Sequence, residues 1–284
     1  MINQMPAKII DGKSAADDIL ENIRKKVKNL KEKPGLALVL VGDNPASEIY
    51  VNFKEKTCKE VGFYCERYNL DNGISEIDLL KLVGELNQKT NIHGILVQLP
   101  LPKHMDEHLV TNSILPHKDV DGFTSASLGM LFSGKPLLAP ATARAVMQLI
   151  DSTGTKTDGK HAVIVGRSNI VGKPVAMLLL ERNATVTICH SRTRNLQGYT
   201  KDADILIVAA GKANLIKKDM IKKGSVVIDV GINRVNGKVM GDVDFENVKE
   251  AAGYITPVPK GVGPMTIAML LDNTLKAMEL ASKI

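Results

Sequence analysis

The sequence predicts an α/β protein with mostly parallel sheets, and three observations lead to this fold class. Apolar runs typical of strands alternate with helical stretches four times in the first half of the 284-residue chain. The same alternation returns in the second half. Between residues 162 and 180, an apolar run, a glycine turn and a helical run follow one another directly. Alternation of this kind is typical of parallel sheets with crossover helices.

The first half contains six predicted elements besides turns. Apolar periodicity predicts helices over residues 14–30 and 77–87, and strands over residues 36–41, 65–70 and 94–99. A further helix is expected to begin at Asn44 and Pro45, because Asn is a favourable N-cap and Pro suits the first helical position. It should end before Gly62.

The second half repeats the pattern after a connector over residues 125–150. Strands are predicted over residues 162–165, 184–189, 205–208 and 226–230, with helices between them. A last helix over residues 266–281 could pack on either half. The stretch before it, residues 257–264, is rich in proline and glycine, and we interpret it as a rigid, ligand-facing loop.

Composition restricts the class of protein. A chain of 284 residues can form two domains or one large one. Its 44% hydrophobic and 24% charged residues are typical of a soluble globular protein. The net charge of +6 is modest, the lysines are spread along the chain, and there are no tryptophans. This argues against a nucleic-acid partner, which requires a basic patch or stacking aromatic residues.

Cysteine usage and the lack of long apolar runs indicate a cytoplasmic location. The three cysteines, Cys58, Cys65 and Cys189, are an odd number without C-x-x-C spacing. They therefore indicate a reducing compartment, and neither a disulfide framework nor a zinc site. The N-terminal stretch lacks the apolar run of a signal peptide, and no segment is apolar for long enough to cross a membrane.

The segment around Gly166 predicts a phosphate-binding turn. Glycine allows the backbone to approach a pyrophosphate closely, and the helix after Gly172 would offer unpaired N–H groups. The pattern departs from G-x-G-x-x-G, because Ser168 stands at the position of the second glycine. On this segment alone, a dinucleotide site and an ordinary strand-to-helix corner are equally supported.

The residues after the next predicted strand favour NADP over NAD. An NAD site usually has a carboxylate there, which binds the ribose 2′-hydroxyl. This chain instead has the run from His190 to Arg194, with imidazole, hydroxyl and guanidinium groups. These groups, together with Arg167, suit a 2′-phosphate. The alternative is an ordinary solvated basic loop.

One face of the helix after Asn44 carries candidate catalytic groups. Ser47, Tyr50 and Lys54 share this face, because Tyr50 follows Ser47 by three residues and Lys54 follows it by seven. A lysine partly desolvated against an aromatic ring can transfer protons near neutral pH. The alternative is a surface lysine, as we expect for Lys56.

Two further polar residues are candidates. Gln98 follows an apolar strand, at the strand end where open α/β sheets bind ligands, although it could equally bond a loop. Asp121 precedes Gly122, so it could form an Asx turn or accept two N–H bonds from an amino-pyrimidine ring. The sequence by itself leaves both alternatives open.

Seven motifs together make the chain resemble a known family, the bifunctional methylenetetrahydrofolate dehydrogenase/methenyltetrahydrofolate cyclohydrolases. They occur in the family's order and cover nearly the whole chain. The motifs are YVNFKEK (50–56), VQLPLPKH (97–104), HKDVDGF (117–123), VGRSNIVGKP (165–174), CHSRT (189–193), GDVDF (241–245) and PKGVGPMT (259–266).

The resemblance implies two α/β domains with a cleft between them, the C-terminal one a Rossmann-like, doubly wound NADP-binding sheet. The implied folate-binding catalytic domain spans residues 1–122 and 266–284, and the NADP-binding domain with its connector helix spans residues 123–265. The implied reactions of one-carbon metabolism are oxidation of 5,10-methylenetetrahydrofolate with NADP and hydrolysis of the methenyl product to 10-formyltetrahydrofolate. A homodimer formed through the nucleotide domains is also implied.

The resemblance also implies roles for single residues. Lys54 would transfer the proton in hydrolysis, Gln98 would orient it and help to hold it uncharged, and Asp121 would bind the pterin ring. Tyr50 would shape the folate pocket, and Pro264 would contact substrate. The implied NADP contacts are Gly166, Arg167, Ser168, Ser191 and Ile232. No metal is implied, and no cluster with ligand spacing is present in the sequence.

Two departures from the family pattern are present. Residues 140–145 read PATARA, where the family usually has P-C-T-P-x-G, and alanines there favour a helix that begins near Thr142. Lys260 stands where glycine is common, and we expect the loop to shift or to use an ordinary backbone, because lysine rarely takes a positive φ. The alternatives are therefore a dehydrogenase with an impaired cyclohydrolase step and a non-catalytic nucleotide-binding regulator.

Overall fold

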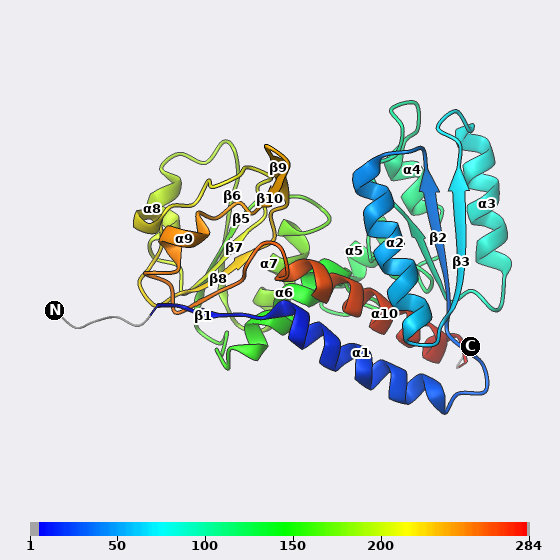
Figure 1. Ribbon diagram of the computed structural model, residues 1–284, viewed down its shortest axis with the longest axis horizontal. Helices are drawn as coiled ribbons and strands as arrows, with labels where there is room; N and C mark the ends of the chain where they lie inside the picture. Colours follow the sequence, from blue (N-terminus) through cyan, green and yellow to red (C-terminus); the bar gives the residue numbers. More distant parts are fainter. Residues whose placement is uncertain (1–5, 283–284) are drawn as a thin grey trace. The chain divides into compact units, whose positions relative to one another are not determined.

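The computed structural model describes residues 6–282, and the chain divides into two compact units, each built on its own parallel sheet (Figure 1). The three-stranded unit comprises residues 18–141 and 267–284, and the six-stranded unit comprises residues 1–17 and 142–266. The predicted two-domain α/β class is confirmed. The expectation about the N-terminal stretch falls partly on residues 1–5, which lie outside the described residues.

The compact units differ from the predicted domain ranges at two places. The first residues join the six-stranded unit because β1 (Lys8–Ile9) pairs with β11 (Tyr254–Ile255). The stretch 123–141 belongs to the three-stranded unit. It contains α5 (Ser125–Phe132), and α6 (Ala141–Ser152) follows it. The predicted connector therefore consists of two helices, of which only the second leads into the six-stranded unit.

The three-stranded unit has the strand order β3-β2-β4, with all neighbours parallel. Its elements are α1 (Gly12–Lys28), β2 (Gly35–Val41), α2 (Pro45–Glu60), β3 (Tyr64–Leu70), α3 (Glu76–Gln88), β4 (Gly94–Val97) and α4 (Glu107–Asn112). All seven residues of β2 are buried, as expected for the central strand of a parallel sheet. The α2 and α3 helices flank β2 and β3 (Figure 1).

The beginning of α2 confirms the predicted N-cap. The Asn44 side chain accepts hydrogen bonds from the N–H groups of Ala46 and Ser47, at 3.0 and 3.2 Å, and Pro45 opens the helix. These bonds satisfy backbone donors that have no partner within the helix. They also fix where α2 starts, and therefore which of its residues face the sheet.

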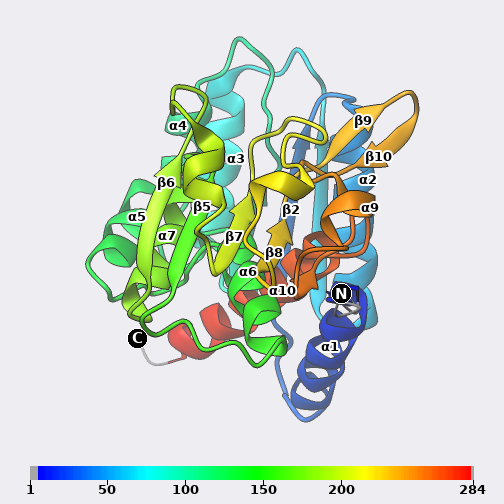
Figure 2. The ribbon, with the colours of Figure 1, turned by 90° about the vertical axis from the view of Figure 1, so that its left-hand side faces the viewer.

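The six-stranded unit has the order β1-β11-β8-β7-β5-β6, again all parallel (Figure 2). Its main elements are β5 (His161–Val165), α7 (Gly172–Glu181), β6 (Thr185–Cys189), α8 (Leu196–Thr200), β7 (Ile205–Val208) and β8 (Val226–Asp229). Because β6 and β7 lie on opposite sides of β5, the strand order reverses at β5. Open α/β sheets bind ligands at such a switch point.

Several short elements were not predicted, because they are too short to show periodicity. They are β1, β11, a 3-10 turn (Lys218–Met220), α9 (Phe245–Val248) and a hairpin of β9 (Asn233–Val235) and β10 (Lys238–Met240). The hairpin did have a sequence signal. Asn236 and Gly237 both have positive φ, 49° and 77°, as an Asn-Gly hairpin turn requires.

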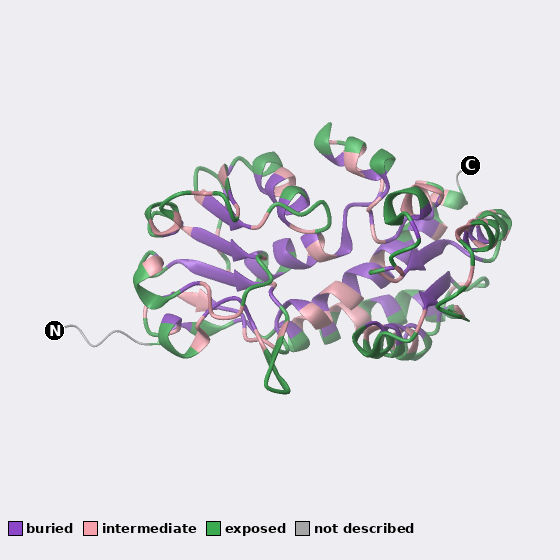
Figure 3. Cartoon of the chain, turned by 90° about the horizontal axis from the view of Figure 1, so that it is seen from above, coloured by how far each residue is buried: buried purple, intermediate pink, exposed green. Residues whose placement is uncertain are grey.

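The last helix, α10 (Val262–Ala281), begins four residues before the predicted start. Its later residues belong to the three-stranded unit, where Asn273 Nδ2 donates to the carbonyls of Val120 (2.8 Å) and Ala139 (2.9 Å). The strands β2, β4, β5, β7 and β8 are largely buried, whereas exposed residues gather on turns, on outer helix faces and in part on the edge strands (Figure 3). Among the described residues, no helix has the length and apolar character to span a membrane.

Candidate active site

Lys54 lies on the buried face of α2, together with Ser47, Val51 and Cys58. Only 8% of Lys54 is exposed, so its interpretation as a surface lysine is wrong. The neighbouring Lys56 is exposed as predicted, and forms an ion pair of 3.8 Å with Glu60. The helical spacing of the sequence therefore separated the two lysines correctly. Burial of the amine lowers the pKa of Lys54 below its ordinary value.

Gln98 holds the Lys54 amine. Lys54 Nζ donates to Gln98 Oε1 at 3.0 Å, while Gln98 Nε2 donates to the Leu99 carbonyl at 2.7 Å. The backbone N–H of Gln98 donates to Val39, so the residue continues the pairing of β4 with β2. The alternative in which Gln98 bonds a loop is therefore confirmed, whereas its place in a ligand site stays a prediction. The bond to the loop directs the amide oxygen toward Lys54.

The turn after α4 is organised by Asp119, not by Asp121. The buried Asp119 carboxylate accepts hydrogen bonds from the N–H groups of Gly122 (2.9 Å), Phe123 (3.2 Å) and Thr124 (2.8 Å). Asp119 is thus the Asx residue of the turn. Sequence analysis missed this role, although the spacing of Asp119 before Gly122 was a signal for it.

Asp121 is left with its hydrogen-bonding capacity unused. Within residues 6–282 its carboxylate has no hydrogen-bond partner. Burial raises the pKa of Asp121, Asp119 reinforces this shift, and Lys54 opposes it by attraction. In turn, the Asp121 charge opposes the lowering of the Lys54 pKa. Lys54, Gln98 and Asp121 therefore form one electrostatically linked cluster within the three-stranded unit.

The remaining substrate candidates lie in two places. Tyr50 is half-buried on α2, one turn before Lys54. Pro264 lies in the first turn of α10, in the part that clusters with the six-stranded unit. The loop before it contains Lys260, which takes a φ of 81°. The expectation that lysine would impose an ordinary backbone is wrong, because the flanking loop holds this residue in the left-handed region.

The glycine turn at the end of β5, residues 166–172, is the candidate phosphate cradle. Gly166 has a φ of 136°, and a Cβ there would lie 2.2 Å from the Ala209 carbonyl oxygen. Ser168 accepts hydrogen bonds through its hydroxyl from the N–H groups of Val171 (3.1 Å) and Gly172 (3.4 Å). Arg167 and Ser168 are exposed. Glycine is therefore required at the first position, as the phosphate-binding pattern predicts.

The open backbone donors differ from those expected. The first N–H groups of α7 are already bonded, since Gly172 and Lys173 donate to Ser168 and Pro174 has no N–H. Among the described residues, the N–H groups of residues 167–170 have no acceptor. The expectation that the helix N-terminus offers unpaired donors is wrong, and the preceding loop offers them instead.

The end of β6 and the segment after β8 carry the other cofactor candidates. A tight turn, in which the Thr193 N–H donates to the His190 carbonyl at 2.8 Å, exposes Ser191 and Arg192. Ile232, directly before β9, is 49% exposed. No carboxylate is present in the turn, so a 2′-phosphate would meet hydroxyl and guanidinium groups there.

Comparison with known proteins decides between the sequence-based alternatives. The family model described as "Tetrahydrofolate dehydrogenase/cyclohydrolase, catalytic domain" matches residues 10–121. The model described as "Tetrahydrofolate dehydrogenase/cyclohydrolase, NAD(P)-binding domain" matches residues 140–282. The chain belongs to the tetrahydrofolate dehydrogenase/cyclohydrolase family.

Individual members of the family are similar over almost the full chain. The bifunctional protein FolD of Moorella thermoacetica is 56% identical over 277 residues, which cover 96% of this chain and 99% of that protein. The crystal structure of the bifunctional dehydrogenase/cyclohydrolase FolD from Campylobacter jejuni has a TM-score of 0.95 at 48% identity, covering 96% and 99%. The Trypanosoma brucei FolD, solved with NADP cofactor and an inhibitor, has a TM-score of 0.95 at 36% identity, covering 99% and 100%.

These similarities confirm the predicted family, the Rossmann-like NADP-binding unit and the bifunctional dehydrogenase/cyclohydrolase that uses NADP.

The chain's departure from the family at residues 140–145 has a structural consequence. Ala141, Ala143 and Ala145 are fully buried in the first turns of α6, so the predicted helix near Thr142 is present. The small side chains allow close packing at this point.

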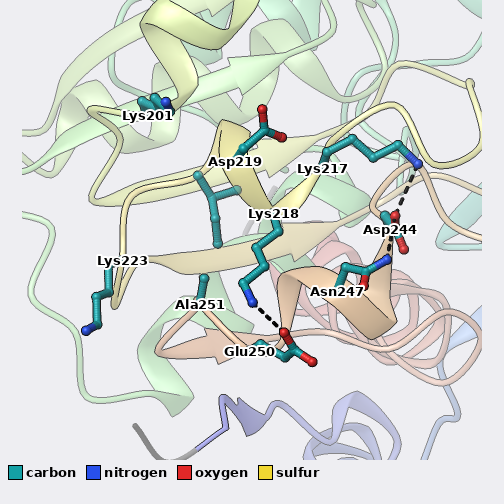
Figure 4. Close-up of a pocket in the computed structure, with 10 residues that line it drawn as sticks. Lys201, Lys217, Lys218, Asp219, Lys223, Asp244, Asn247, Glu250 and Ala251 are labelled. Carbon is teal, nitrogen blue, oxygen red and sulfur yellow. Dashed lines mark hydrogen bonds and ion pairs between the residues drawn. The ribbon is translucent and has the colours of Figure 1, made fainter. Parts of the chain in front are cut away.

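A surface hollow elsewhere in the six-stranded unit is lined by several lysines and acids (Figure 4). Lys217 pairs with Asp244 at 3.1 Å, and Lys218 pairs with Glu250. Because these charges neutralise one another, the hollow is not a strong anion site. Within the described part of the chain, no group of three or more His, Cys, Asp or Glu side chains is arranged to hold a metal.

Proposed function

We propose that the chain oxidises 5,10-methylenetetrahydrofolate to 5,10-methenyltetrahydrofolate with NADP and then hydrolyses this product to 10-formyltetrahydrofolate, with Lys54 transferring the proton. The observation that carries this proposal is the 3.0 Å contact between buried Lys54 Nζ and Gln98 Oε1. Burial of an amine costs free energy. A nucleotide-binding regulator would gain nothing from such a group, whereas a hydrolase needs a proton shuttle.

The hydrolysis follows from the lowered pKa of Lys54. An uncharged amine accepts a proton from water as the water oxygen bonds to the cationic methenyl carbon. The resulting ammonium then returns the proton to the ring nitrogen as the carbon–nitrogen bond breaks. The hydroxyl of the intermediate releases its own proton to water in the same step, which leaves a formyl group on the other nitrogen. One lysine thus acts first as base and then as acid.

Gln98 is proposed to orient the amine during both steps. Its Oε1 accepts one N–H of Lys54, and its Nε2 is held by the Leu99 carbonyl. An uncharged amine bound in this way keeps its lone pair available for the water proton. A carboxylate at the same place would instead stabilise the ammonium form and oppose the first step.

Asp121, Tyr50 and Pro264 are proposed to bind the folate. The Asp121 carboxylate has no hydrogen-bond partner within residues 6–282, so its oxygens can accept N–H bonds from an amino-pyrimidine ring. Tyr50 lies one helical turn from Lys54 and offers a flat apolar surface. Pro264 would contact the substrate from the first turn of α10.

NADP fits the residues at the ends of β5, β6 and β8. We assign its binding to Gly166, Arg167, Ser168, Ser191 and Ile232. The unbonded N–H groups of residues 167–170 suit a pyrophosphate, and the exposed turn after β6 suits a 2′-phosphate. When bound, NADP supplies the carbon that accepts the hydride. The chain's own contribution to that step is to hold both ligands in place.

The test is a spectrophotometric assay of purified protein with methylenetetrahydrofolate and NADP. We expect the wild type to form NADPH without accumulating the methenyl product. Lys54→Ala should still form NADPH but should accumulate the methenyl product, because removal of a proton shuttle slows hydrolysis about 100-fold or more. Lys56→Ala, on the exposed side of the same helix, is the matched control and should behave as wild type.

Other outcomes of that assay would contradict the proposal in distinct ways. Absence of NADP reduction by the wild type would rule out the dehydrogenase and revive the regulator hypothesis. Accumulation of the methenyl product by the wild type would indicate a dehydrogenase with an impaired cyclohydrolase. Unimpaired hydrolysis by Lys54→Ala would remove Lys54 from the mechanism.

We also propose a homodimer formed through the six-stranded unit. β6 is an edge strand of this sheet, so one side of its backbone has no strand partner. Ile188 on this strand and Leu180 on α7 are 37% and 56% exposed. Sedimentation of the wild type should give twice the chain mass, and Ile188→Lys should give the monomer. A monomeric wild type would refute the assembly.

A cytoplasmic location is proposed from the state of the cysteines. Cys58, Cys65 and Cys189 are all free thiols, as is usual in a reducing compartment. Fractionation of cells that express the chain should recover it with cytoplasmic markers. Recovery in another fraction would contradict the location without affecting the proposed chemistry.

A further inference from the structure

The GDVDF motif (Gly241–Phe245) is part of the family pattern, but the proposed chemistry gives it no role. It brings two buried carboxylates together in the six-stranded unit. Asp242 belongs to the motif and is fully buried, and Asp229, the last residue of β8, is 3% exposed. Burial of carboxylates is costly unless hydrogen bonds satisfy them. Their partners therefore show what these side chains do.

Asp229 ties the motif to the end of β8. Its Oδ1 accepts from the N–H groups of Gly231 (2.9 Å) and Asp242 (3.0 Å), and its Oδ2 accepts from Val243 (2.9 Å). Three backbone donors from two separate segments thus converge on one side chain. The Asp229 bonds fix the backbone that places the Asp242 carboxylate.

Asp242 in turn holds the loop that follows β7. Its Oδ2 accepts from Ala210 (2.6 Å) and Gly211 (2.9 Å), and its Oδ1 accepts from the N–H of Lys212 (2.9 Å). Asn233 Nδ2 also donates to Asp242 Oδ1, at 2.8 Å. A single carboxylate therefore fixes three consecutive N–H groups of the β7 loop and the first residue of β9.

Both segments held by Asp242 adjoin proposed cofactor positions. The β7 loop begins at Ala209, whose carbonyl oxygen lies 2.2 Å from where a Cβ on Gly166 would stand. Ile232 lies between Gly231, which packs against Asp242, and Asn233, which donates to it. A Cβ on Gly231 would lie 2.2 Å from Asp242 Cγ. Asp242 thus connects the floor of the phosphate cradle with the Ile232 segment.

We infer that Asp242 is a positioning residue for NADP, which acts by fixing the β7 loop beneath Gly166 and the segment that presents Ile232. This inference rests on the proposed cofactor positions Gly166 and Ile232. Asp242 is fully buried, and its two oxygens already accept four hydrogen bonds. It therefore acts through the backbone that it holds. A carboxylate suits this task because N–H bonds to a charged oxygen are stronger than neutral ones.

The test is Asp242→Asn, assayed for both reactions and for NADP binding. The substitution replaces one acceptor oxygen with an NH2 group that faces backbone donors. We expect the Kd and KM for NADP to rise at least tenfold. Hydrolysis of added methenyltetrahydrofolate, which requires no NADP, should stay within about twofold of wild type, because Lys54, Gln98 and Asp121 lie in the three-stranded unit.

Asp244→Asn is the matched control. Asp244 belongs to the same motif, but its carboxylate is directed to Lys217 and Asn247, at 3.1 and 3.0 Å, and not to the β7 loop. The Kd for NADP should therefore be unchanged in this variant. A similar rise in both variants would show a general effect of the motif's charge and overturn the positioning role.

If Asp242→Asn also loses hydrolysis, a milder variant tests whether Asp242 positions the NADP-binding segments. Asn233→Ala removes one bond to Asp242 and a 3.3 Å bond to the Met240 carbonyl, and leaves the three backbone bonds to Asp242. A raised Kd for NADP with normal hydrolysis supports the inference, and an unchanged Kd overturns it. Failure of the wild type to bind and reduce NADP would refute the proposed function itself, so the two failures are distinguishable.

Discussion

The three-stranded and six-stranded units both bury charged side chains, but they leave them in opposite states. Asp229 and Asp242 accept three and four hydrogen bonds, and most of the donors are backbone N–H groups. Lys54 donates to Gln98 alone among the described residues, and the carboxylate of the half-buried Asp121 has no hydrogen-bond partner there. The first pair shapes backbone, whereas the second keeps donors and acceptors for a ligand.

This difference shows how burial distinguishes a structural charge from a chemical one. A buried charge with a complete set of partners stabilises one local conformation. A buried charge with few partners keeps donors or acceptors for a ligand and can exchange protons with it. Asp119 is an informative intermediate case, because it is a structural carboxylate located two residues from the chemical Asp121.

The largest effect should come from removing a structural carboxylate within the catalytic unit. Asp119→Ala would leave the N–H groups of Phe123 and Thr124 without an acceptor, and Gly122 with only the Asp119 carbonyl, and should lower the free energy of unfolding by about 3 kcal/mol. Asp121→Asn in the same turn is the control, with little loss expected. Urea denaturation measures both. Equal losses would show that the two carboxylates do not differ as the structure indicates.

The next effect concerns Asp229, one of the two structural carboxylates, and is measured as the pH dependence of the free energy of unfolding. Burial raises the pKa of Asp229 to about 7, well above its value in an unfolded chain, so its contribution to stability is present at low pH. It is lost as the pH rises through about 7. The destabilisation caused by Asp229→Asn should therefore be roughly 2 to 3 kcal/mol smaller at about pH 8 than at about pH 5. A constant difference across urea titrations at both pH values would contradict this.

A smaller effect of opposite sign is expected for the chemical lysine. Lys54→Met removes a buried amine that lacks a full set of partners, and should raise the free energy of unfolding by about 1 kcal/mol while abolishing hydrolysis. Because burial lowers the Lys54 pKa, this gain should shrink as the pH rises toward the ordinary lysine pKa. Thermal denaturation at several pH values measures it. A destabilised variant would mean that Lys54 is structural.

The smallest effect concerns the strained loop before α10. Lys260 is held at a φ of 81°, so Lys260→Gly should relieve strain and raise the free energy of unfolding by up to about 1 kcal/mol. Lys260→Ala keeps the strain and removes the charge. An increase in stability with alanine as large as that with glycine would point to charge and not to backbone strain.

The sequence alone determined most of the repeating structure and the chemical types at the site. Apolar runs located the buried strands β2, β5, β7 and β8, because a strand buried on both faces needs continuous apolar residues. Asn44 and Pro45 located the start of α2 through local backbone chemistry. The motifs that carry the family resemblance contain Lys54, Gln98 and Asp121. Motifs of this kind are runs of neighbouring residues, so they can be recognised without knowledge of the fold.

The tertiary structure decided what distant residues do to one another. Whether Lys54 is buried, and whether Gln98 reaches it, depends on the packing of α2 against residues 44 positions away. The spacing of Asp119 before Gly122 is compatible with a turn, but Asp121 stands in the same turn, and only the fold shows which carboxylate meets the N–H groups. The sequence also could not predict that Lys260 takes a positive φ, since its surroundings overcome its own preference. Burial and hydrogen-bond partners are properties of three-dimensional packing, and local sequence does not contain them.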